Sequence, residues 1–130
     1  MRSESREWIK IALEDLEAAK CLIKEELYRM VCYHSQQAVE KSLKAILTEH
    51  QADFKKTHNI IDLKNEAVSF GYEIKFADED LVFLNSIYRI RYPSDTGLLP
   101  YSEPNKEDAE KAINIANNFI VPLIPSLCRQ

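Results

Sequence analysis

Glycine is scarce in this chain of 130 residues, since only Gly71 and Gly97 are present. A β-rich fold of this length normally needs more glycines for its tight turns, so the shortage favours long helices joined by few loops. Long hydrophobic runs are also missing, because no uninterrupted apolar stretch approaches the ~18–20 residues of a membrane span. The sequence therefore argues against a β-rich fold and against a membrane-spanning protein.

Cysteine is sparse and irregularly placed. Cys21, Cys32 and Cys128 are odd in number, and no two of them have the close spacing of zinc ligands, so we expect no metal site and no cofactor. We expect all three to be reduced thiols in the core of a cytoplasmic protein. The first ten residues, MRSESREWIK, lack the apolar segment of a secretory signal peptide, which agrees with a cytoplasmic location.

Positive charge is also in short supply, since the net charge is −4 and the pI is about 5.4. This balance argues against a protein that coats nucleic acid through bulk electrostatics, although it leaves room for a local basic patch. Hydrophobic residues make up 45% of the chain and charged residues 29%, which is typical of a globular protein. The length fits a single domain over residues 1–130.

Apolar residues recur every three or four positions in five stretches, as they do on one face of a helix. The first stretch, residues 5–27, predicts a helix that Ser3 or Ser5 caps. The second stretch, residues 29–50, follows almost at once. A third helix is expected to begin after Thr57 as its N-cap and to end at Gly71 in a left-handed conformation.

The last two helices flank the longest predicted loop. Asp78 is expected to cap the fourth helix, which ends near Arg91 because a proline follows. Asn105 is expected to cap the fifth helix, with Pro122 kinking it and Pro125 ending its regular part. The sequence thus predicts an all-α fold, an up-down bundle of four to five helices.

The second predicted helix has two unlike faces at about 100° per residue. One face is small and apolar. The other gathers hydrogen-bonding side chains, namely Tyr33, His34, Gln36, Gln37, Glu40, Lys41, Lys44 and Thr48. The spacings Gln37–Lys41 and Glu40–Lys44 suit a solvated surface. The tyrosine, histidine and glutamines are hydrogen-bonding groups of fixed geometry, which suit a polar interface or pocket wall, so both interpretations remain open.

Three segments together resemble the HEPN domain family: YHSQQAVEKSLKAIL in the second helix, THNIIDL at the third, and YRIRYPSD at the end of the fourth. The resemblance extends over nearly the whole chain. It implies an α-helical up-down bundle that is commonly a homodimer. It also implies partnership with a minimal nucleotidyltransferase in a two-component, toxin–antitoxin-like system.

Other members of that family are metal-independent ribonucleases that use an arginine followed four to six residues later by a histidine. At the corresponding position this chain has Arg89 and Arg91, but no histidine follows either of them. Asp95 stands at one of the required offsets, but the usual pKa of an aspartate is far too low for a general base at neutral pH. Arg29 and His34 have the spacing elsewhere, yet on a regular helix they point about 140° apart, so we interpret this match as coincidence.

Arg89, Arg91 and Tyr92 form a compact basic-aromatic cluster in an otherwise acidic chain. Arginine can hold a phosphate through two hydrogen bonds, and tyrosine can stack on a base. Alternatively, the arginines could pair with Glu40 or Asp95 and hold the following loop in place. The sequence leaves these two interpretations equal.

We therefore expect a binding and partner module rather than an enzyme, with a nucleotide or RNA phosphate as its ligand. The expected ligand-binding or interface residues are Tyr33, His34, Gln37, Glu40, Lys41, Lys44, Arg89, Arg91 and Tyr92. A purely structural, dimeric helical protein is one alternative. The other is a divergent endoribonuclease that uses His34 with Arg29 or Arg91. His50 and His58 are expected to be structural.

Overall fold

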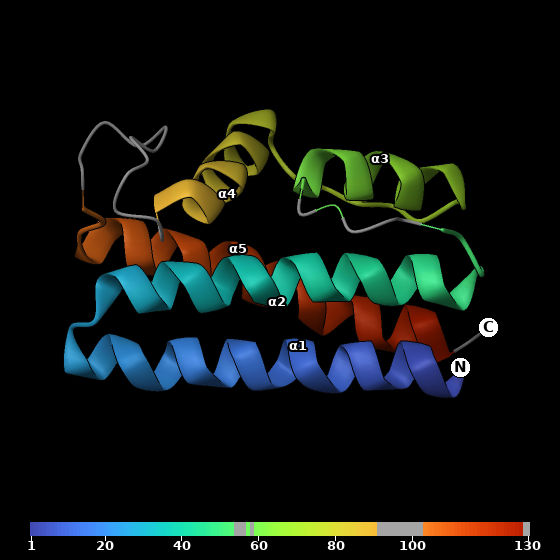
Figure 1. The fold of residues 1–130 in the computed structure, drawn as a ribbon, viewed down its shortest axis with the longest axis horizontal. Coiled ribbons are helices and arrows are strands. Elements are labelled where there is room, and N and C mark those ends of the chain that lie inside the picture. Colours follow the sequence, from blue (N-terminus) through green and yellow to red (C-terminus); the bar gives the residue numbers. More distant parts are fainter. Residues whose placement is uncertain (54–56, 58, 91–102, 129–130) are drawn as a thin grey trace.

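The computed structural model describes residues 1–53, 57, 59–90 and 103–128, without the side chains of residues 88–90. These residues form five α-helices and one 3₁₀ turn, and they contain no strand: α1 (Ser3–Leu22), η1 (Ile23–Glu25), α2 (Tyr28–Glu49), α3 (Ile60–Ser69), α4 (Asp78–Ile90) and α5 (Lys106–Cys128). Figure 1 shows α1 and α2 antiparallel and side by side, α5 behind them, and α3 and α4 along the other side of α2. The predicted all-α helical bundle is confirmed.

The C-terminal end of α1 comes earlier than its apolar pattern predicts. The helix stops at Leu22, a 3₁₀ turn follows, and Glu26 adopts a left-handed conformation with φ 59° before α2 begins. Neither predicted serine caps it, because Ser3 is already helical, Ser5 is buried within the first turn, and Arg2 occupies the N-cap position without a side-chain bond. The prediction of a serine cap was therefore wrong.

α3 is capped by Asn59 rather than by the predicted Thr57. The Asn59 side chain accepts hydrogen bonds from the backbone nitrogens of Ile61 and Asp62 at 3.0 and 3.3 Å. Thr57 lies two residues before this cap, and its hydroxyl oxygen accepts a hydrogen bond from the backbone nitrogen of Asn59 at 3.1 Å. At the other end Gly71 has φ 91°, which confirms the predicted left-handed stop.

The caps and ends predicted for α4 and α5 are confirmed only in part. Asp78 is the first residue of α4, inside the helix rather than before it. Asn105 does cap α5, since its side-chain oxygen accepts from the nitrogen of Asp108 at 2.9 Å while the Asp108 carboxylate accepts from the nitrogen of Asn105 at 3.0 Å. α5 nevertheless continues through Pro122 and Pro125 to Cys128, so the predicted end at Pro125 was wrong.

The continuation of α5 through two prolines has a physical reason. Each proline lacks an N–H and so deprives the carbonyl four residues earlier of its partner. Asn118 and Val121, which carry those carbonyls, are exposed, so water can reach that side of the helix. Leu123 and Leu127 are buried on the other side and keep the last turns packed on the core.

α2 lies at the centre of the core. It packs against α1, α3, α4 and α5, and its apolar residues Val31, Val39, Leu43, Ile46 and Leu47 are fully buried. Cys32 is buried as predicted, but Cys21 and Cys128 are exposed, so the expectation of three core thiols was wrong for those two. None of the helices in the described part of the chain is long and apolar enough to cross a membrane.

Candidate functional site: a buried polar layer on α2

The polar face of α2 is sheltered from solvent. Gln36 and Glu40 are 0% and 1% exposed, and Gln37 and Lys44 are 5% and 6% exposed. A solvated helix surface would leave such side chains in water, so the interpretation of this face as an ordinary surface was wrong. Figure 1 shows the reason, since α2 is flanked by α1 on one side and by α3 and α4 on the other.

Asp15 of α1 joins two of the predicted site residues. Its carboxylate oxygens lie 2.8 Å from His34 Nδ1 and 3.2 Å from Lys41 Nζ. The side chains are 13% (Asp15), 22% (His34) and 24% (Lys41) exposed, so the contacts are partly withdrawn from water. His34 and Lys41 are seven residues apart, about two helical turns, which puts both on the side of α2 that meets α1.

A second set of contacts continues along the same helix. Lys44 Nζ lies 3.3 Å from a carboxylate oxygen of Glu40, as the spacing predicted, and 5.7 Å from the centre of the Trp8 ring. Gln37 donates to the side-chain oxygen of Gln36 at 2.8 Å. We refer to Asp15, His34, Gln36, Gln37, Glu40, Lys41 and Lys44 as the polar layer.

One amide group in the polar layer is incompletely satisfied. The side-chain nitrogen of Gln36 is buried and has no hydrogen-bond partner among the residues that the structure describes. A buried donor without an acceptor costs about 1–3 kcal/mol, so proteins retain few such groups. Because Gln36 is 0% exposed, this donor is enclosed by the packed helices and does not face solvent.

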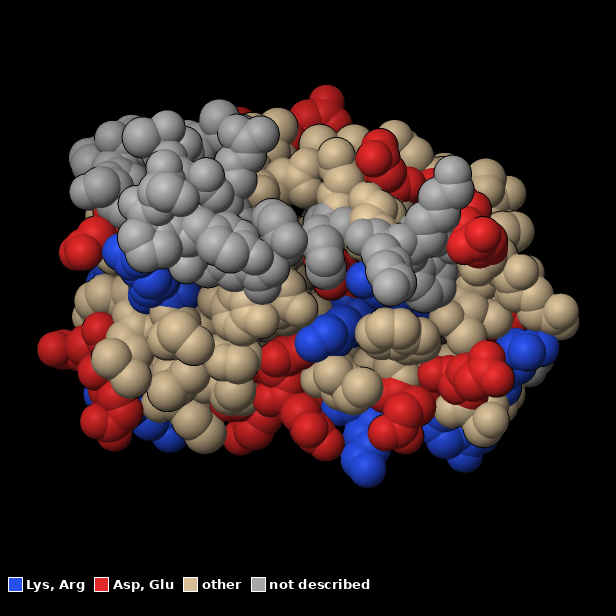
Figure 2. Space-filling view, viewed as in Figure 1, with Lys and Arg blue, Asp and Glu red and all other residues tan. Residues whose placement is uncertain are grey.

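The formal charges of the polar layer balance. The ammonium groups of Lys41 and Lys44 face the carboxylates of Asp15 and Glu40, with His34 as the additional titratable group. Figure 2 likewise shows acidic and basic side chains interspersed over α1 rather than gathered in a patch of one sign. A phosphate bound here would have to compete with Asp15 for the His34 and Lys41 donors.

The geometry around His34 also suits proton transfer. Because Asp15 contacts Nδ1, the ring nitrogen that can face a substrate is Nε2, which is the arrangement of a histidine base oriented by a carboxylate. The Tyr33 ring meets the His34 ring edge-on, with centroids 5.1 Å apart, and further limits its orientation.

Arg29 and His34, whose spacing we interpreted as coincidence, have separate partners. Arg29 lies 3.5 Å from a carboxylate oxygen of Glu103, three residues before α5, whereas His34 contacts Asp15 of α1. No contact between Arg29 and His34 is found among the described residues. The two side chains are therefore directed to different neighbours, as the helical geometry predicted.

The other predicted site residues lie outside the part of the chain that the structure describes. Arg89 belongs to α4 by its backbone, but its side chain is not described, and Arg91, Tyr92 and Asp95 fall in the segment 91–102. The expectation that Arg89, Arg91 and Tyr92 share one ligand site with the polar residues of α2 therefore stays a prediction. His58 is also outside the described residues.

His50 lies at the C-cap of α2. Its Nε2 is 3.0 Å from the Tyr72 hydroxyl, and its ring stacks on Phe70 with centroids 4.7 Å apart. These contacts tie the end of α2 to the segment after α3, which supports the structural role expected of His50. No group of three metal-binding side chains occurs in the ranges that the structure describes.

Sequence reasoning missed the contribution of α1. Asp15 and Trp8 complete the polar layer, yet in the sequence Asp15 is one of several acidic residues on an amphipathic helix. Its one distinguishing signal is its place directly before the buried Leu16. That position brings it closer to the core than the exposed Glu14.

Comparison with known proteins gives consistent matches over most of the chain. The model of the HEPN domain family matches residues 5–123. A Methanocaldococcus jannaschii protein named "Putative toxin MJ1304" is 35% identical over 127 residues, which covers 87% of this chain and 81% of the relative. A second protein of that organism, named "Putative toxin MJ0605", is 29% identical over 126 residues, covering 92% and 86%.

The fold has solved counterparts as well. The crystal structure of ST0689, an archaeal HEPN homologue, is similar with a TM-score of 0.71 and 27% sequence identity, covering 98% of this chain and 99% of that chain. The similarity therefore includes the arrangement of the helices as well as the sequence.

Proposed function

Because this chain belongs to the HEPN domain family, we propose that it is the toxin-like component of a two-component system and that its polar layer is a binding site. The names of the two relatives support the toxin-like role. The observation that carries the binding role is the meeting of Asp15, His34 and Lys41 within hydrogen-bond distance, on side chains that remain 13%, 22% and 24% exposed. A ligand or partner site requires polar side chains that are held in a fixed orientation and can still be reached from solvent.

The proposed ligand is a nucleotide or an RNA phosphate. Lys41 and His34 can donate to a phosphate, in competition with Asp15. Arg89, Arg91 and Tyr92 would add phosphate and stacking contacts if they face the same site.

Calorimetric titration with ATP, other nucleotides and short RNAs tests the ligand. We expect saturable binding that grows tighter in the Asp15→Asn variant, because loss of the carboxylate releases Lys41 and His34 for the phosphate. Glu14→Gln removes an exposed carboxylate from the neighbouring position and should leave the affinity unchanged. If no nucleotide or RNA produces heat above dilution with either protein, the phosphate site is excluded.

The proposed partner is a minimal nucleotidyltransferase, with this chain as a homodimer. A nucleotidyltransferase gene beside that of this chain would supply the protein for co-purification, and we expect the two to elute together. Sedimentation of the isolated chain tests the dimer, which a monomer at every accessible concentration would contradict. The free thiols of Cys21, Cys32 and Cys128 agree with a cytoplasmic setting for this pair.

A divergent ribonuclease is the second candidate, and the contact between Asp15 and His34 favours it. A base with its Nδ1 held by a carboxylate can take the proton of a ribose 2′-hydroxyl through Nε2. RNA incubated with the protein in EDTA would then be cleaved, and both His34→Ala and Asp15→Asn should slow the reaction. Unchanged cleavage by His34→Ala would exclude this role. Asp15→Asn thus separates the candidates, since it should strengthen phosphate binding but weaken catalysis.

A further inference from the structure

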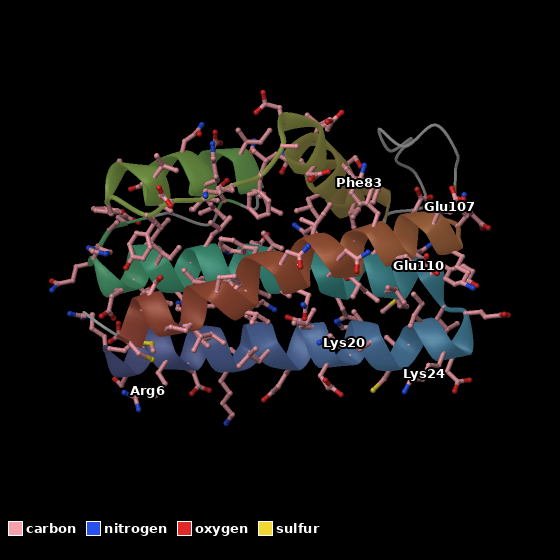
Figure 3. The ribbon with its side chains drawn as sticks, turned by 180° about the vertical axis from the view of Figure 1, so that it is seen from behind. Arg6, Lys20, Lys24, Phe83, Glu107 and Glu110 are labelled. Carbon is pink, nitrogen blue, oxygen red and sulfur yellow. The ribbon has the colours of Figure 1, made fainter. Side chains whose placement is uncertain are left out.

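A groove runs along α5 on the face of the molecule seen in Figure 3. One wall is a long face of α5 from Glu107 to Ser126, and the other is the connector between α3 and α4, Phe70 to Phe76, with Asp80. Its volume is about 1080 Å³. The groove contains no residue of the polar layer, so it is independent of the function proposed above.

The floor of the groove is apolar and partly open. Ile115 and Leu123 are buried there, while Phe119 and Phe76 are half-buried, with ring centroids 5.0 Å apart. Ile115, Phe119 and Leu123 follow one another at four-residue steps along α5. Such a row forms a ridge on a helix, and a second helix can pack against a ridge of this kind.

The rim of the groove is mainly acidic. Four carboxylates line it, those of Glu73, Asp80, Glu107 and Glu110, against the ammonium groups of Lys75 and Lys111. Lys111 Nζ lies 3.9 Å from a carboxylate oxygen of Asp80 and 4.6 Å from the centre of the Phe83 ring. Figure 3 shows Glu107 and Glu110 at the beginning of α5.

Glu107 and Glu110 are therefore accessible to a partner. Both are exposed, and the contact of Glu110 with Lys106 at 3.9 Å joins two exposed side chains, which makes it weak. The electrostatic complement of this rim is a cation.

The length of the groove indicates an elongated occupant. From residue 107 to residue 126, α5 extends over roughly 29 Å, far longer than a single nucleotide. An amphipathic helix lies in such a groove with its apolar side on the floor and its polar side on the rim. We propose that this groove binds an amphipathic helix of a partner protein, one whose polar side carries lysine or arginine.

A pair of designed peptides tests the proposal with the intact chain. Both are amphipathic helices of about twenty residues with leucine on the apolar side, and the polar side carries lysine in one and glutamate in the other. We expect fluorescence anisotropy to detect binding of the lysine peptide and not of the glutamate peptide. Binding of neither peptide, or of both alike, would overturn the proposal.

Variants of the rim locate the binding. Neutralising both carboxylates in the Glu107→Gln/Glu110→Gln variant should weaken binding of the lysine peptide by roughly tenfold. The matched control is Glu4→Gln/Glu7→Gln, which removes two exposed carboxylates from α1 and should have no effect. Equal weakening by both pairs would mean general attraction to an acidic protein and would overturn the proposal.

Two further measurements keep the result unambiguous. Asn118→Arg places a cation in the groove at an exposed position of α5, so it should abolish peptide binding while the circular dichroism spectrum stays that of the native helix bundle. Peptide binding that survives this substitution in a folded protein would contradict the groove as the site. Concentration-dependent self-association that disappears in Glu107→Gln/Glu110→Gln would instead assign the groove to a second copy of this chain and overturn the partner helix.

Discussion

Asp15 accepts hydrogen bonds from two side chains on another helix, His34 and Lys41. Because all three groups are partly withdrawn from water, each has given up some of its hydration. The hydrogen bonds from His34 and Lys41 to the Asp15 carboxylate offset that loss of hydration. Removal of the carboxylate would therefore leave two donors poorly solvated at once.

Asp15→Asn should lower the free energy of unfolding by about 1–3 kcal/mol, because the amide keeps one accepting oxygen but turns an NH₂ group toward the other partly buried donor, which loses its acceptor. Urea denaturation measures the change. The control is Glu14→Gln, the exposed neighbour on the same helix, for which we expect a change within about 0.5 kcal/mol. Equal stabilities for the two variants would mean that the contacts of Asp15 contribute nothing net to folding.

The three cysteines differ in reactivity for reasons of burial. Burial, with a smaller contribution from the negative charge of Asp108, raises the pKa of Cys32 from 9.0 to about 12, whereas Cys21 and Cys128 are exposed. Since the thiolate is the reacting form, Cys32 should be inert in the folded protein. Titration with Ellman's reagent at pH 8 should release two equivalents quickly and the third only in denaturant. Three fast equivalents would contradict a closed core around Cys32.

At the scale of the helices, α3 depends on two asparagines from different elements. Asn59 accepts from the first turn of α3, and Asn85 of α4 donates to Asn59 and accepts from the nitrogen of Ile60 at 2.9 Å. Asn59→Ala should therefore cost about 1 kcal/mol of stability, as loss of an N-cap usually does. Asn59→Asp keeps the accepting oxygen and should cost less. Thermal unfolding of the two variants checks the order, and equal losses would argue against capping as the cause.

The beginning of α1 is joined to the end of α2 by a contact that depends on pH. The backbone nitrogen of Arg2 donates to a carboxylate oxygen of Glu49 at 2.9 Å, and this bond lowers the pKa of Glu49 below its ordinary value of 4.5, although partial burial acts in the opposite direction. A lowered pKa in the folded state means that the ionised carboxylate stabilises the fold above pH 4.5. That contribution is lost as the pH falls through the lowered pKa.

Glu49→Gln should consequently be less stable than the natural chain at pH 7, and the difference should shrink as the pH falls below 4.5. Denaturation midpoints measured between pH 3 and pH 7 check this. Glu7→Gln, an exposed change on α1, serves as the control and should show no such convergence. A difference that stays constant with pH would mean that Glu49 acts through packing and not through its charge.

The number, order and approximate limits of the helices could be predicted, because apolar spacing reports directly on the buried face. The capping residues were harder to predict. Thr57 and Asn59 are both good capping residues two positions apart, and the contact with Asn85 of α4, which favours Asn59, is a tertiary one. Pro125 suggested an end to α5, but the burial of Leu127 keeps the helix packed beyond it.

For the candidate site, the sequence identified the side chains on α2 but not their surroundings. The types of residue at positions 33–44 indicated an unusual face, and the structure shows that much of it is buried. Asp15 could not be singled out, because its pairing with His34 depends on how α1 and α2 are aligned. Periodicity within one helix carries no information about that alignment.

At the scale of the whole molecule, α2 is the element that every other helix contacts. Its burial on nearly all sides means that α1, α3, α4 and α5 lose their shared packing surface if α2 shifts. We therefore propose that residues 1–130 unfold as one cooperative unit, as a single domain would. The alternative is that the pair α1 and α2 remains folded when α5 separates.

Leu43→Ala tests this proposal, because Leu43 is fully buried in the middle of α2. Loss of its side chain should lower the free energy of unfolding by about 2–5 kcal/mol. If the molecule is one unit, hydrogen exchange of the most protected amides in α1 and α5 should accelerate by the same factor, since both exchange through global unfolding. Val68→Ala on α3, where the side chain is 43% exposed, should leave these rates nearly unchanged. Acceleration confined to one of the two helices would mean that α1 and α5 belong to separate cooperative units.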